Sequence, residues 1–350
     1  MSNITTDLKF LPSISIIVVT FNCEKILEEC LESINMQNYP TEKVEVLVID
    51  GGSSDKTVDI AREHNARVIF GGFPENQEPR RAIGLLNSKN DLVAFIDSDN
   101  LLPDNNWLRE AVQPLIEDKE IVATQPLYFT YRKSDSVINR YFALIGVNDP
   151  VAYYLRKSDR LTYFARTWNL YGKAADKGKY LKVEFDTKYM PPLGCNGFVA
   201  RRKKLINLSL NNEMLIPSFT HTDAAYDLIN GGEKYFGIVK NGIIHVTSKG
   251  SFLKYLIKRT FYINMHTFSG MPRKYKVFDL KKTKDAFNLV KFVLISLTII
   301  IPLFDSIRGF IKINDIAWFV HPIMCISMLF YYSVTTIISK IKFKVVRVKR

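Results

Sequence analysis

The sequence predicts an α/β fold in which a mainly parallel sheet is flanked by helices, followed by a helical C-terminal membrane anchor. Three observations predict it. Through the first third of the chain, β-branched runs alternate with segments of helical apolar spacing, which favours parallel strands joined by helices. Polar residues follow these strands directly, and apolar residues gather after Phe287. At 350 residues the chain has room for a sizeable core and for up to two domains.

The expected strands and helices of the first third alternate without interruption. β-branched and apolar runs predict strands over 14–20, 44–49, 67–70 and 92–96. Apolar residues three and four positions apart predict the helices between them, over 24–37, 58–64 and 80–89. Further along, we expect a helix over 107–116, a strand over 121–124, a short helix over 224–229 and a strand or hairpin over 238–245.

The carboxyl ends of the expected parallel strands carry polar residues. Asn22, Asp50 and Asp97 all fall at such ends, where open α/β sheets bind their ligands, so we expect a nucleotide site there. Two glycines after Asp50 permit close approach of the backbone, with Asp50 accepting from a base or ribose. For that turn alone, an ordinary strand–turn–helix link with a Ser or Asp cap is the alternative. Neither a Gly-x-Gly-x-x-Gly nor a Walker A motif follows the first strand.

Asp97 and Asp99 stand one residue apart where the buried strand 92–96 ends. Side chains at i and i+2 of an extended strand share one face, so both carboxylates could bind one divalent cation, directly or through water. Oxygen ligands suit Mg²⁺ or Mn²⁺, which take further oxygens from water and a substrate diphosphate. A solvated turn is the alternative, because Asp, Ser and Asn favour turns.

The net charge of +13 predicts an anionic partner, and nucleic acid, a nucleotide sugar and an anionic membrane all qualify. The four cysteines lack a Cys-x-x-Cys spacing, which fits a reducing compartment without zinc or disulfides. No secretory signal is expected at the N-terminus.

Aromatic and basic residues interleave over 128–189. This pattern suits nucleic-acid binding, sugar stacking, lipid-phosphate binding or plain helical packing, and the sequence leaves all four as alternatives. The aromatic and basic residues are Tyr131, Arg132, Tyr141, Tyr153, Tyr154, Arg156, Arg160, Tyr163, Trp168 and Tyr171.

Three segments, 15–22, 48–57 and 95–99, resemble the signature segments of the family 2 glycosyltransferases, which have the GT-A fold. The resemblance covers roughly residues 12–245. It implies that Asp99 holds Mn²⁺ or Mg²⁺ on the donor diphosphate, that Asp97 lies near the donor ribose or the water shell of the metal, and that Ser98 is a further donor-binding residue. It also implies a nucleotide cradle, usually for uridine, built from Thr20, Phe21, Asn22 and Asp50.

Further segments extend this resemblance. Residues 80–84 are similar to an Arg-Asn-x-Gly segment, with Ala82 in place of the usual Asn, and imply that Arg81 faces the nucleotide; a solvated helix charge is the alternative. Residues 194–197 are similar to a Gly-x-Asn-Gly segment, which implies that Gly194 and Asn196 lie near the donor sugar. No residue flanking Cys195 would activate its thiolate, so we do not expect a nucleophile there.

The family places its catalytic carboxylate in a Glu-Asp or Asp-Asp pair, and here the pair is Thr222-Asp223. The resemblance therefore implies that Asp223 is the general base. It also implies that His245 completes the metal site, with a structural histidine at a strand end as the alternative.

Two apolar runs near the C-terminus, 287–304 and 316–339, predict membrane spans. Residues 251–266 suit a helix on a membrane surface, or one that packs on the catalytic domain. Basic residues precede the first span and follow the second, which predicts that both termini and the catalytic domain are cytoplasmic. Helices buried in a soluble core are the alternative to the spans.

The expected domains follow from these assignments. A catalytic domain covers 1–248, with a nucleotide-binding half over 12–125 and an acceptor half over 126–248. A basic interfacial linker covers 249–286, and the two spans with a basic tail cover 287–350.

Together, the residues and the resemblance predict a membrane-anchored, inverting glycosyltransferase of the cell membrane, active in cell-surface glycan synthesis. Its expected donor is a nucleotide sugar, with UDP the first choice, and its expected acceptor is lipid-linked or a glycan. A polyprenyl-phosphate monosaccharide synthase is the alternative within this class, and a non-catalytic nucleotide-sugar-binding membrane protein is the alternative outside it. No nucleic-acid partner is expected, because much of the positive charge flanks the spans, where anionic lipid explains it.

Overall fold

The computed structural model describes residues 11–158, 160–210, 213–247, 251–263, 273–276, 279 and 281–348. The expected domain boundary at 248, residues 264–266 of the expected surface helix, and Lys349 and Arg350 of the basic tail lie outside the described residues.

The chain divides into two compact units. A sheet unit comprises Met1–Thr130 and Tyr171–His245, and a helical unit comprises Tyr131–Leu170 and Val246–Arg350. Residues 131–170, which belong to the expected acceptor half, are therefore grouped with the C-terminal helices.

The sheet unit is built on one sheet whose path runs β3-β2-β1-β4-β9-β6-β10-β8-β7, with β5 paired to β10 beside this path. β3, β2, β1 and β4 are mutually parallel and β6 is parallel to β10, whereas β9 runs antiparallel to β4 and β6. The strands are β1 Ile14–Thr20, β2 Val44–Asp50, β3 Arg67–Phe70, β4 Leu92–Asp97, β5 Asn100–Leu101, β6 Ile121–Phe129, β7 Lys173–Asp176, β8 Tyr180–Glu184, β9 Phe198–Arg201 and β10 Tyr235–His245.

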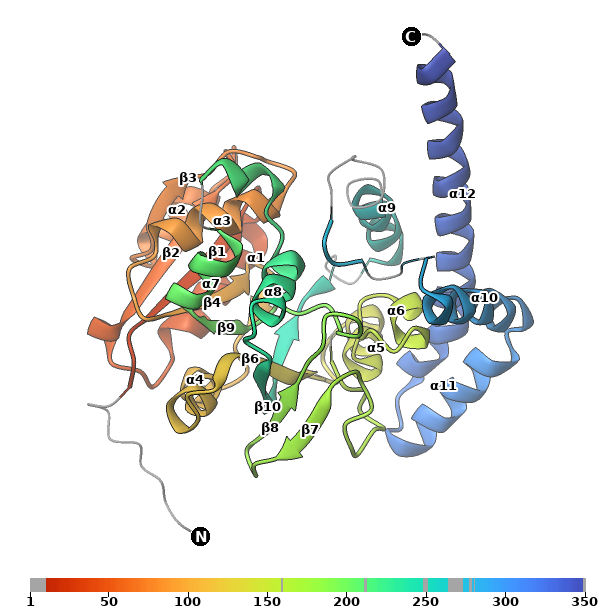
Figure 1. Cartoon of the computed structure of the whole chain (residues 1–350), viewed down its shortest axis with the longest axis horizontal. Helices are drawn as coiled ribbons and strands as arrows, with labels where there is room; N and C mark the ends of the chain where they lie inside the picture. Colours follow the sequence, from red (N-terminus) through yellow and green to blue (C-terminus); the bar gives the residue numbers. More distant parts are fainter. Residues whose placement is uncertain are drawn as a thin grey trace. The chain divides into compact units, whose positions relative to one another are not determined.

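Helices flank this sheet (Figure 1). α3 packs on β1 and β2, α4 packs on β6 and β10, and α8 packs on α7. Since helices cover the sheet, β1 is buried over its whole length, including its polar residues Ser15 and Thr20. The helical segments are α1 Glu24–Asn35, η2 Thr41–Lys43, α2 Thr57–Glu63, α3 Gln77–Asn87, α4 Trp107–Glu117, α7 Arg202–Ser209, η3 Glu213–Ser218 and α8 His221–Asn230.

The expected α/β fold is thus confirmed, and the alternation from β1 to β4 agrees with the sequence to within a few residues at each helix end. The β7–β8 hairpin was not predicted. β7 is exposed along its whole length and lies at the edge of the sheet, so it carries no apolar pattern that would mark a strand.

The helical unit packs its helices around α12. Tyr141 and Tyr154 contact the two ring nitrogens of His321, at 2.9 and 3.0 Å, and all three lie inside this unit. For these two tyrosines the structure favours the packing interpretation over a surface that stacks on sugars or bases. The unit contains α5 Val137–Ile145, α6 Pro150–Tyr154, α9 Phe252–Ile263, α10 Thr283–Thr298, α11 Ile300–Lys312, η6 Ile316–Phe319 and α12 Val320–Val348.

The first expected span, 287–304, is not one straight helix. It is divided between α10 and α11, which are bent by 83° where they meet. Ile299 at the break has a φ of +60°, and Pro302 follows three residues later. A helix that continued straight from α10 would need a backbone N–H at position 302, which proline lacks, and the proline ring would clash with the carbonyl of the preceding turn. In the described residues, Ile316–Ile338 is long and apolar enough to span a membrane, and the bent pair adds a second span only if it is counted as one. The prediction of two spanning helices is therefore not confirmed.

Candidate functional site

The parallel register brings the expected polar residues to one edge of the sheet. Thr20 of β1 pairs with Asp50 of β2, and Val19 of β1 pairs with Asp97 of β4. Three strands therefore end side by side, and the turns that follow them carry Asn22, Gly51 and Asp99. This is the polar rim that the strand ends predict.

Asp50 is saturated with hydrogen bonds and is only 3% exposed. Its carboxylate accepts from the backbone amides of Gly52 and Ser53, both at 2.8 Å, and from the hydroxyls of Ser53 at 2.6 Å and Thr20 at 3.0 Å. Burial alone would raise the pKa of Asp50, but these hydrogen bonds outweigh it and lower the pKa. Since four donors occupy its lone pairs, Asp50 holds the turn in shape and has little capacity left for a ligand.

Asn22 joins the first two turns of the rim. Its φ is +46°, a conformation that asparagine tolerates better than most residues. Its backbone amide donates to the Ser53 hydroxyl at 2.8 Å, and its side-chain oxygen accepts from the Ser54 amide at 2.9 Å. Asn22 itself is exposed and Phe21 is half-buried, so the turn after β1 presents both to solvent on a preformed backbone.

Asp99 and His245 come together from different parts of the chain. The Oδ2 atom of Asp99 lies 3.6 Å from Nε2 of His245, because Asn100, the first residue of β5, pairs with His245 at the end of β10. A separation of this size lets both atoms reach one divalent ion at bonds of about 2.1 Å. The described residues contain no group of three or more His, Cys, Asp or Glu side chains that could hold a metal. Two protein ligands with oxygens from a diphosphate and water would fit Mn²⁺ or Mg²⁺.

Arg81 is buried and does not lie on a solvated helix face. It is 1% exposed, and its guanidinium donates to Glu78 at 2.8 Å and to Asp97 at 2.6 Å. Both carboxylates raise the pKa of Arg81 against the effect of burial, so the guanidinium stays charged. Arg81 therefore neutralises the first carboxylate of the Asp-x-Asp pair, and Asp99 remains as the carboxylate beside His245.

Glu78 connects this arginine to the start of α8. Its Oε2 accepts from the backbone amide of His221 at 2.8 Å, and its Oε1 lies 2.7 Å from Nδ1 of the same histidine. Burial would raise the pKa of Glu78, but the charges of His221 and Arg81 lower it far below its ordinary value. A continuous hydrogen-bonded path thus runs from Asp97 through Arg81 and Glu78 to His221; we call these four residues the charged relay.

The charged relay holds the first turn of α8, where Asp223 lies. Thr220 caps this helix, and its hydroxyl accepts from the Asp223 amide at 3.2 Å. Asp223 is 8% exposed and stands in the first turn, where the helix dipole favours a carboxylate. The sheet edge and the turn that carries the expected base are therefore rigidly connected.

The loop before β9 packs against the same helix start. Gly194 has a φ of +110°, and a Cβ on it would lie 2.5 Å from the carbonyl oxygen of His221, so only glycine fits there. Asn196, 5% exposed, also has a positive φ, of +51°. Gly194 and Asn196 thus lie beside α8.

Sequence reasoning missed Glu78 and the role of His221. These residues are 143 positions apart and belong to no shared motif, so no local pattern in one sequence pairs them. A glutamate in the first turn of a helix is normally a dipole partner on the surface. Ser98 follows Asp97 in the turn after β4 and is half-buried.

We expect Arg81→Met to destabilise the protein by about 3–5 kcal/mol, because the change leaves the Glu78 carboxylate buried without its guanidinium partner. Urea unfolding followed by circular dichroism measures this loss. Arg62→Met is the matched control, since Arg62 and Asp59 are 69% and 70% exposed and such pairs contribute about 0–1 kcal/mol. Equal stability losses in the two variants would contradict the charged relay.

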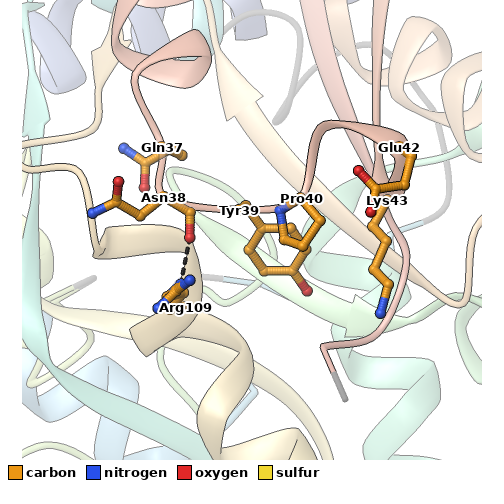
Figure 2. Close-up of a pocket in the computed structure, with 7 residues that line it drawn as sticks. All are labelled: Gln37, Asn38, Tyr39, Pro40, Glu42, Lys43 and Arg109. Atoms are coloured by element: carbon orange, nitrogen blue, oxygen red, sulfur yellow. Dashed lines mark hydrogen bonds between the residues drawn. The ribbon is translucent and has the colours of Figure 1, made fainter. Parts of the chain in front are cut away.

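The structure also has a hollow of about 680 Å³, and Figure 2 shows the residues that line it. It lies between Arg109 and the segment 37–43, which joins α1 to the start of β2. That segment is at the amino end of β2, opposite the carboxyl ends that carry the candidate site. None of the expected site residues lines this hollow.

Comparison with known proteins gives a family match over the N-terminal half. Residues 15–174 match the sequence model described as "Glycosyl transferase family 2". The glycosyltransferase AglE of Haloferax volcanii is 27% identical over 166 residues, which are 46% of this chain and 52% of that protein. A dolichyl N-acetyl-α-D-glucosaminyl phosphate 3-β-D-2,3-diacetamido-2,3-dideoxy-β-D-glucuronosyltransferase of Methanococcus voltae is 32% identical over 106 residues, 29% of this chain and 33% of that protein. The chain spans about half the length, or less, of these curated relatives.

Among solved structures, the mannosyltransferase PcManGT of Pyrobaculum calidifontis, in complex with GDP-Man and Mn²⁺, is similar with a TM-score of 0.51 and 15% identity. The similarity covers 95% of this chain and 88% of that one. At this identity the likeness supports the fold, and with it the GT-A type of sheet that the sequence resemblance implies.

Proposed function

We propose that this chain, whose residues 15–174 carry a glycosyl transferase family 2 domain, is an inverting glycosyltransferase that moves a sugar from a nucleotide sugar to an acceptor hydroxyl. The observation that carries the proposal is the meeting of three strand ends with the Asp99–His245 pair on one sheet edge, connected through the charged relay to the turn that holds Asp223. A nucleotide, a divalent cation and a base are the parts that a single displacement at the anomeric carbon requires.

In this proposal Asp223 takes the proton from the acceptor hydroxyl as it attacks the donor. The turns after β1 and β2 position the nucleotide, with Thr20, Phe21 and Asn22 at the first and the backbone held by Asp50 at the second. Gly194 and Asn196 border the donor sugar. No side chain needs to become glycosylated, because attack by the acceptor on the opposite face inverts the anomeric centre in one step.

Asp99 and His245 are the proposed metal ligands. A divalent cation bound there would offset the charge that develops on the departing diphosphate. Arg81 takes up the charge of Asp97, which leaves Ser98 and Asp97 to orient the donor rather than to bind the ion directly. An imidazole in the ligand set favours Mn²⁺ over Mg²⁺, since nitrogen ligands suit transition ions better than Mg²⁺.

The acceptor is proposed to be lipid-linked and the enzyme to be anchored in the cell membrane, with its sheet unit in the cytoplasm. Ile316–Ile338 holds 23 residues, about 35 Å of helix, which exceeds the ~30 Å of a bilayer core. A matched relative is named for a dolichyl-phosphate-linked sugar, which supports an acceptor of this class. Recovery of the chain in the soluble fraction after carbonate extraction would contradict the anchor.

The experiment that tests the function measures release of nucleoside diphosphate by the purified full-length chain. A panel of UDP-, GDP- and dTDP-sugars is supplied with Mn²⁺, Mg²⁺ or chelator, in the presence of lipid extract. We expect metal-dependent release from one donor, with UDP sugars first, and a labelled sugar in the lipid fraction. Binding of a donor without release in any lipid extract would favour a non-catalytic binding protein. A product that carries a single sugar on polyprenyl phosphate would favour a monosaccharide synthase.

A further inference from the structure

The bent pair of helices α10 and α11 (Figure 1) turns its large apolar side chains outward. Most of them recur at spacings of three and four residues, so they form a stripe along one side of each helix. Near the two ends of α11, Ile300 is 72% exposed and Ile311 is 76% exposed. We call this stripe the outer face; it consists of Phe287, Val290, Leu294 and Leu297 on α10 and of Ile300, Ile301, Leu303, Phe304, Ile307 and Ile311 on α11.

The buried side of α11 is made of small residues instead. Ser306 donates from Oγ to the backbone oxygens of Pro302 at 2.9 Å and of Trp318 at 2.8 Å. Gly309 lies against the ring of Trp318, since a Cβ on this glycine would stand 2.3 Å from Cδ2 of that ring. A helix in water has the opposite arrangement, with its large apolar side chains in the core. Helices in lipid pack through small residues, because lipid tails are as apolar as the side chains that face them.

The exposed charges of α10 and α11 are all positive. The two acidic residues of the pair bind groups of the helical unit, since Asp285 accepts from Lys157 at 2.8 Å and Asp305 accepts from the Tyr154 hydroxyl at 3.0 Å. A second copy of this chain would bring cations of its own to the border of the outer face, whereas anionic headgroups above acyl chains complement both the charge and the stripe. The exposed charged residues are Lys284, Lys291, Arg308 and Lys312.

The break between the two helices indicates how the pair lies in a bilayer. Since α10 has 16 residues and α11 has 13, a crossing by the pair would place Ile299 near the middle of the hydrocarbon core. Ile299 is exposed and gives α11 no side-chain cap, and the first amides of a helix have no partner within it. Lipid tails offer such amides no acceptor, whereas headgroups and water do. The break therefore suits the surface of the bilayer and not its centre.

The cations point to the same orientation. Lys291 and Arg308 lie near the middle of α10 and α11, and both are exposed. In a crossing pair, these charges would stand within the hydrocarbon, where an ionised side chain is unfavourable. In helices that lie parallel to the membrane, they reach the headgroups along the whole length of each helix.

We propose that the outer face is immersed in one leaflet of an anionic bilayer, that α10 and α11 both lie in the membrane plane, and that the pair does not cross. Thr283 at its start and Asn314 after its end are then on the same side of the membrane. A lipid-linked acceptor has its phosphate and sugar at this level of the bilayer, so the pair holds the helical unit at the surface that presents such an acceptor. The inference rests on the membrane anchor within the proposed function and not on the transfer reaction.

The first measurement determines on which side of the membrane the two ends of the pair lie. Thr283→Cys and Asn314→Cys replace exposed residues, and Ser134→Cys, in the exposed turn before α5, is the reference within the same unit. Sealed vesicles that contain the full-length chain are treated with a membrane-impermeant maleimide, and peptide mass spectrometry measures the label at each position. We expect equal labelling at all three positions. A crossing pair would instead protect one of its two ends until detergent opens the vesicles.

The second measurement determines what covers the outer face. Leu294→Cys and Ile307→Cys carry an environment-sensitive fluorophore, in a Cys23→Ser, Cys195→Ser background whose fold is checked by circular dichroism. The protein is reconstituted in vesicles of phosphatidylcholine and phosphatidylglycerol that contain doxyl lipids, with the quenching group either just below the headgroup or at the bilayer centre. We expect stronger quenching by the shallow group than by the deep one at both positions, and no quenching at Ser134→Cys.

The results that would overturn the proposal are distinct from a failure of transfer. Labelling of Thr283→Cys with protection of Asn314→Cys would mean that the pair crosses. Strongest quenching from the bilayer centre would contradict helices in the membrane plane, and no quenching in a chain that resists carbonate extraction would mean that protein covers the outer face. Carbonate extraction of the chain would remove the anchor and this inference together. If the chain is anchored but releases no nucleoside diphosphate, the proposed reaction fails, while labelling and quenching still decide how the pair lies.

Discussion

Asp223→Asn is expected to lower the rate of sugar transfer by about 10²–10⁴-fold, the usual contribution of a positioned general base. Asparagine keeps the size of the side chain and its place in the first turn of α8, where Thr220 caps the helix. It cannot take a proton, so the acceptor hydroxyl attacks without assistance. Donor binding should stay close to that of the wild type, because the turns that position the nucleotide follow β1 and β2 and do not belong to α8. Transfer assays with calorimetric titration of the donor separate the two effects.

Asp227→Asn is the matched comparison for this variant. Asp227 lies one turn further along the same helix and is half-buried, so the substitution makes the same chemical change in a similar setting. We expect its transfer rate to remain close to that of the wild type. If Asp227→Asn loses transfer and Asp223→Asn keeps it, the base is Asp227 and our assignment is wrong.

Asp99→Ala is expected to remove the dependence of donor binding on the metal and to lower transfer by about 10²–10³-fold. The carboxylate of Asp99 is the one that lies 3.6 Å from the imidazole of His245, whereas that of Asp97 is bound by Arg81. Removing it leaves a single protein ligand, which is too few to hold a divalent cation against water. Titration of the nucleoside diphosphate with and without Mn²⁺ measures the loss.

Asp104→Ala is the control for Asp99→Ala. Asp104 is an exposed aspartate five residues further on, and its carboxylate only caps the Asn106 amide at 2.8 Å. This variant should keep metal-dependent binding. Transfer by the wild-type enzyme that is equal in Mn²⁺ and in chelator would remove the role that we assign to Asp99 and His245.

Much of the sheet could be predicted from the sequence because its signals are local. A short segment made mostly of apolar residues, such as β1 or β4, predicts a buried strand. The alternation of such segments with segments of helical spacing predicts strands joined by helices from β1 to β4. The polar rim follows from the same reasoning, since parallel strands end at one edge. For that reason Asn22, Asp50 and Asp97 could be placed at one edge of the sheet from the sequence alone.

The state of each rim residue could not be predicted. A carboxylate at a strand end looks the same in a sequence whether it faces a ligand or is surrounded by donors, and Asp50 is surrounded by donors. An arginine in a helix likewise looks the same whether it is solvated or buried, and Arg81 is buried between two carboxylates. These outcomes depend on partners that come from other elements.

By itself, the sequence determined the α/β class, the order of the first strands and helices, and the edge at which polar residues gather, because these follow from the periodicity of neighbouring residues. Only the tertiary structure decided which charges neutralise one another, that His221 lies against Glu78, and that the apolar run 287–304 bends at Ile299. Such features depend on distances between residues far apart in the chain, or on whether a helix tolerates a local break. The spacing of neighbouring residues in the sequence contains neither kind of information.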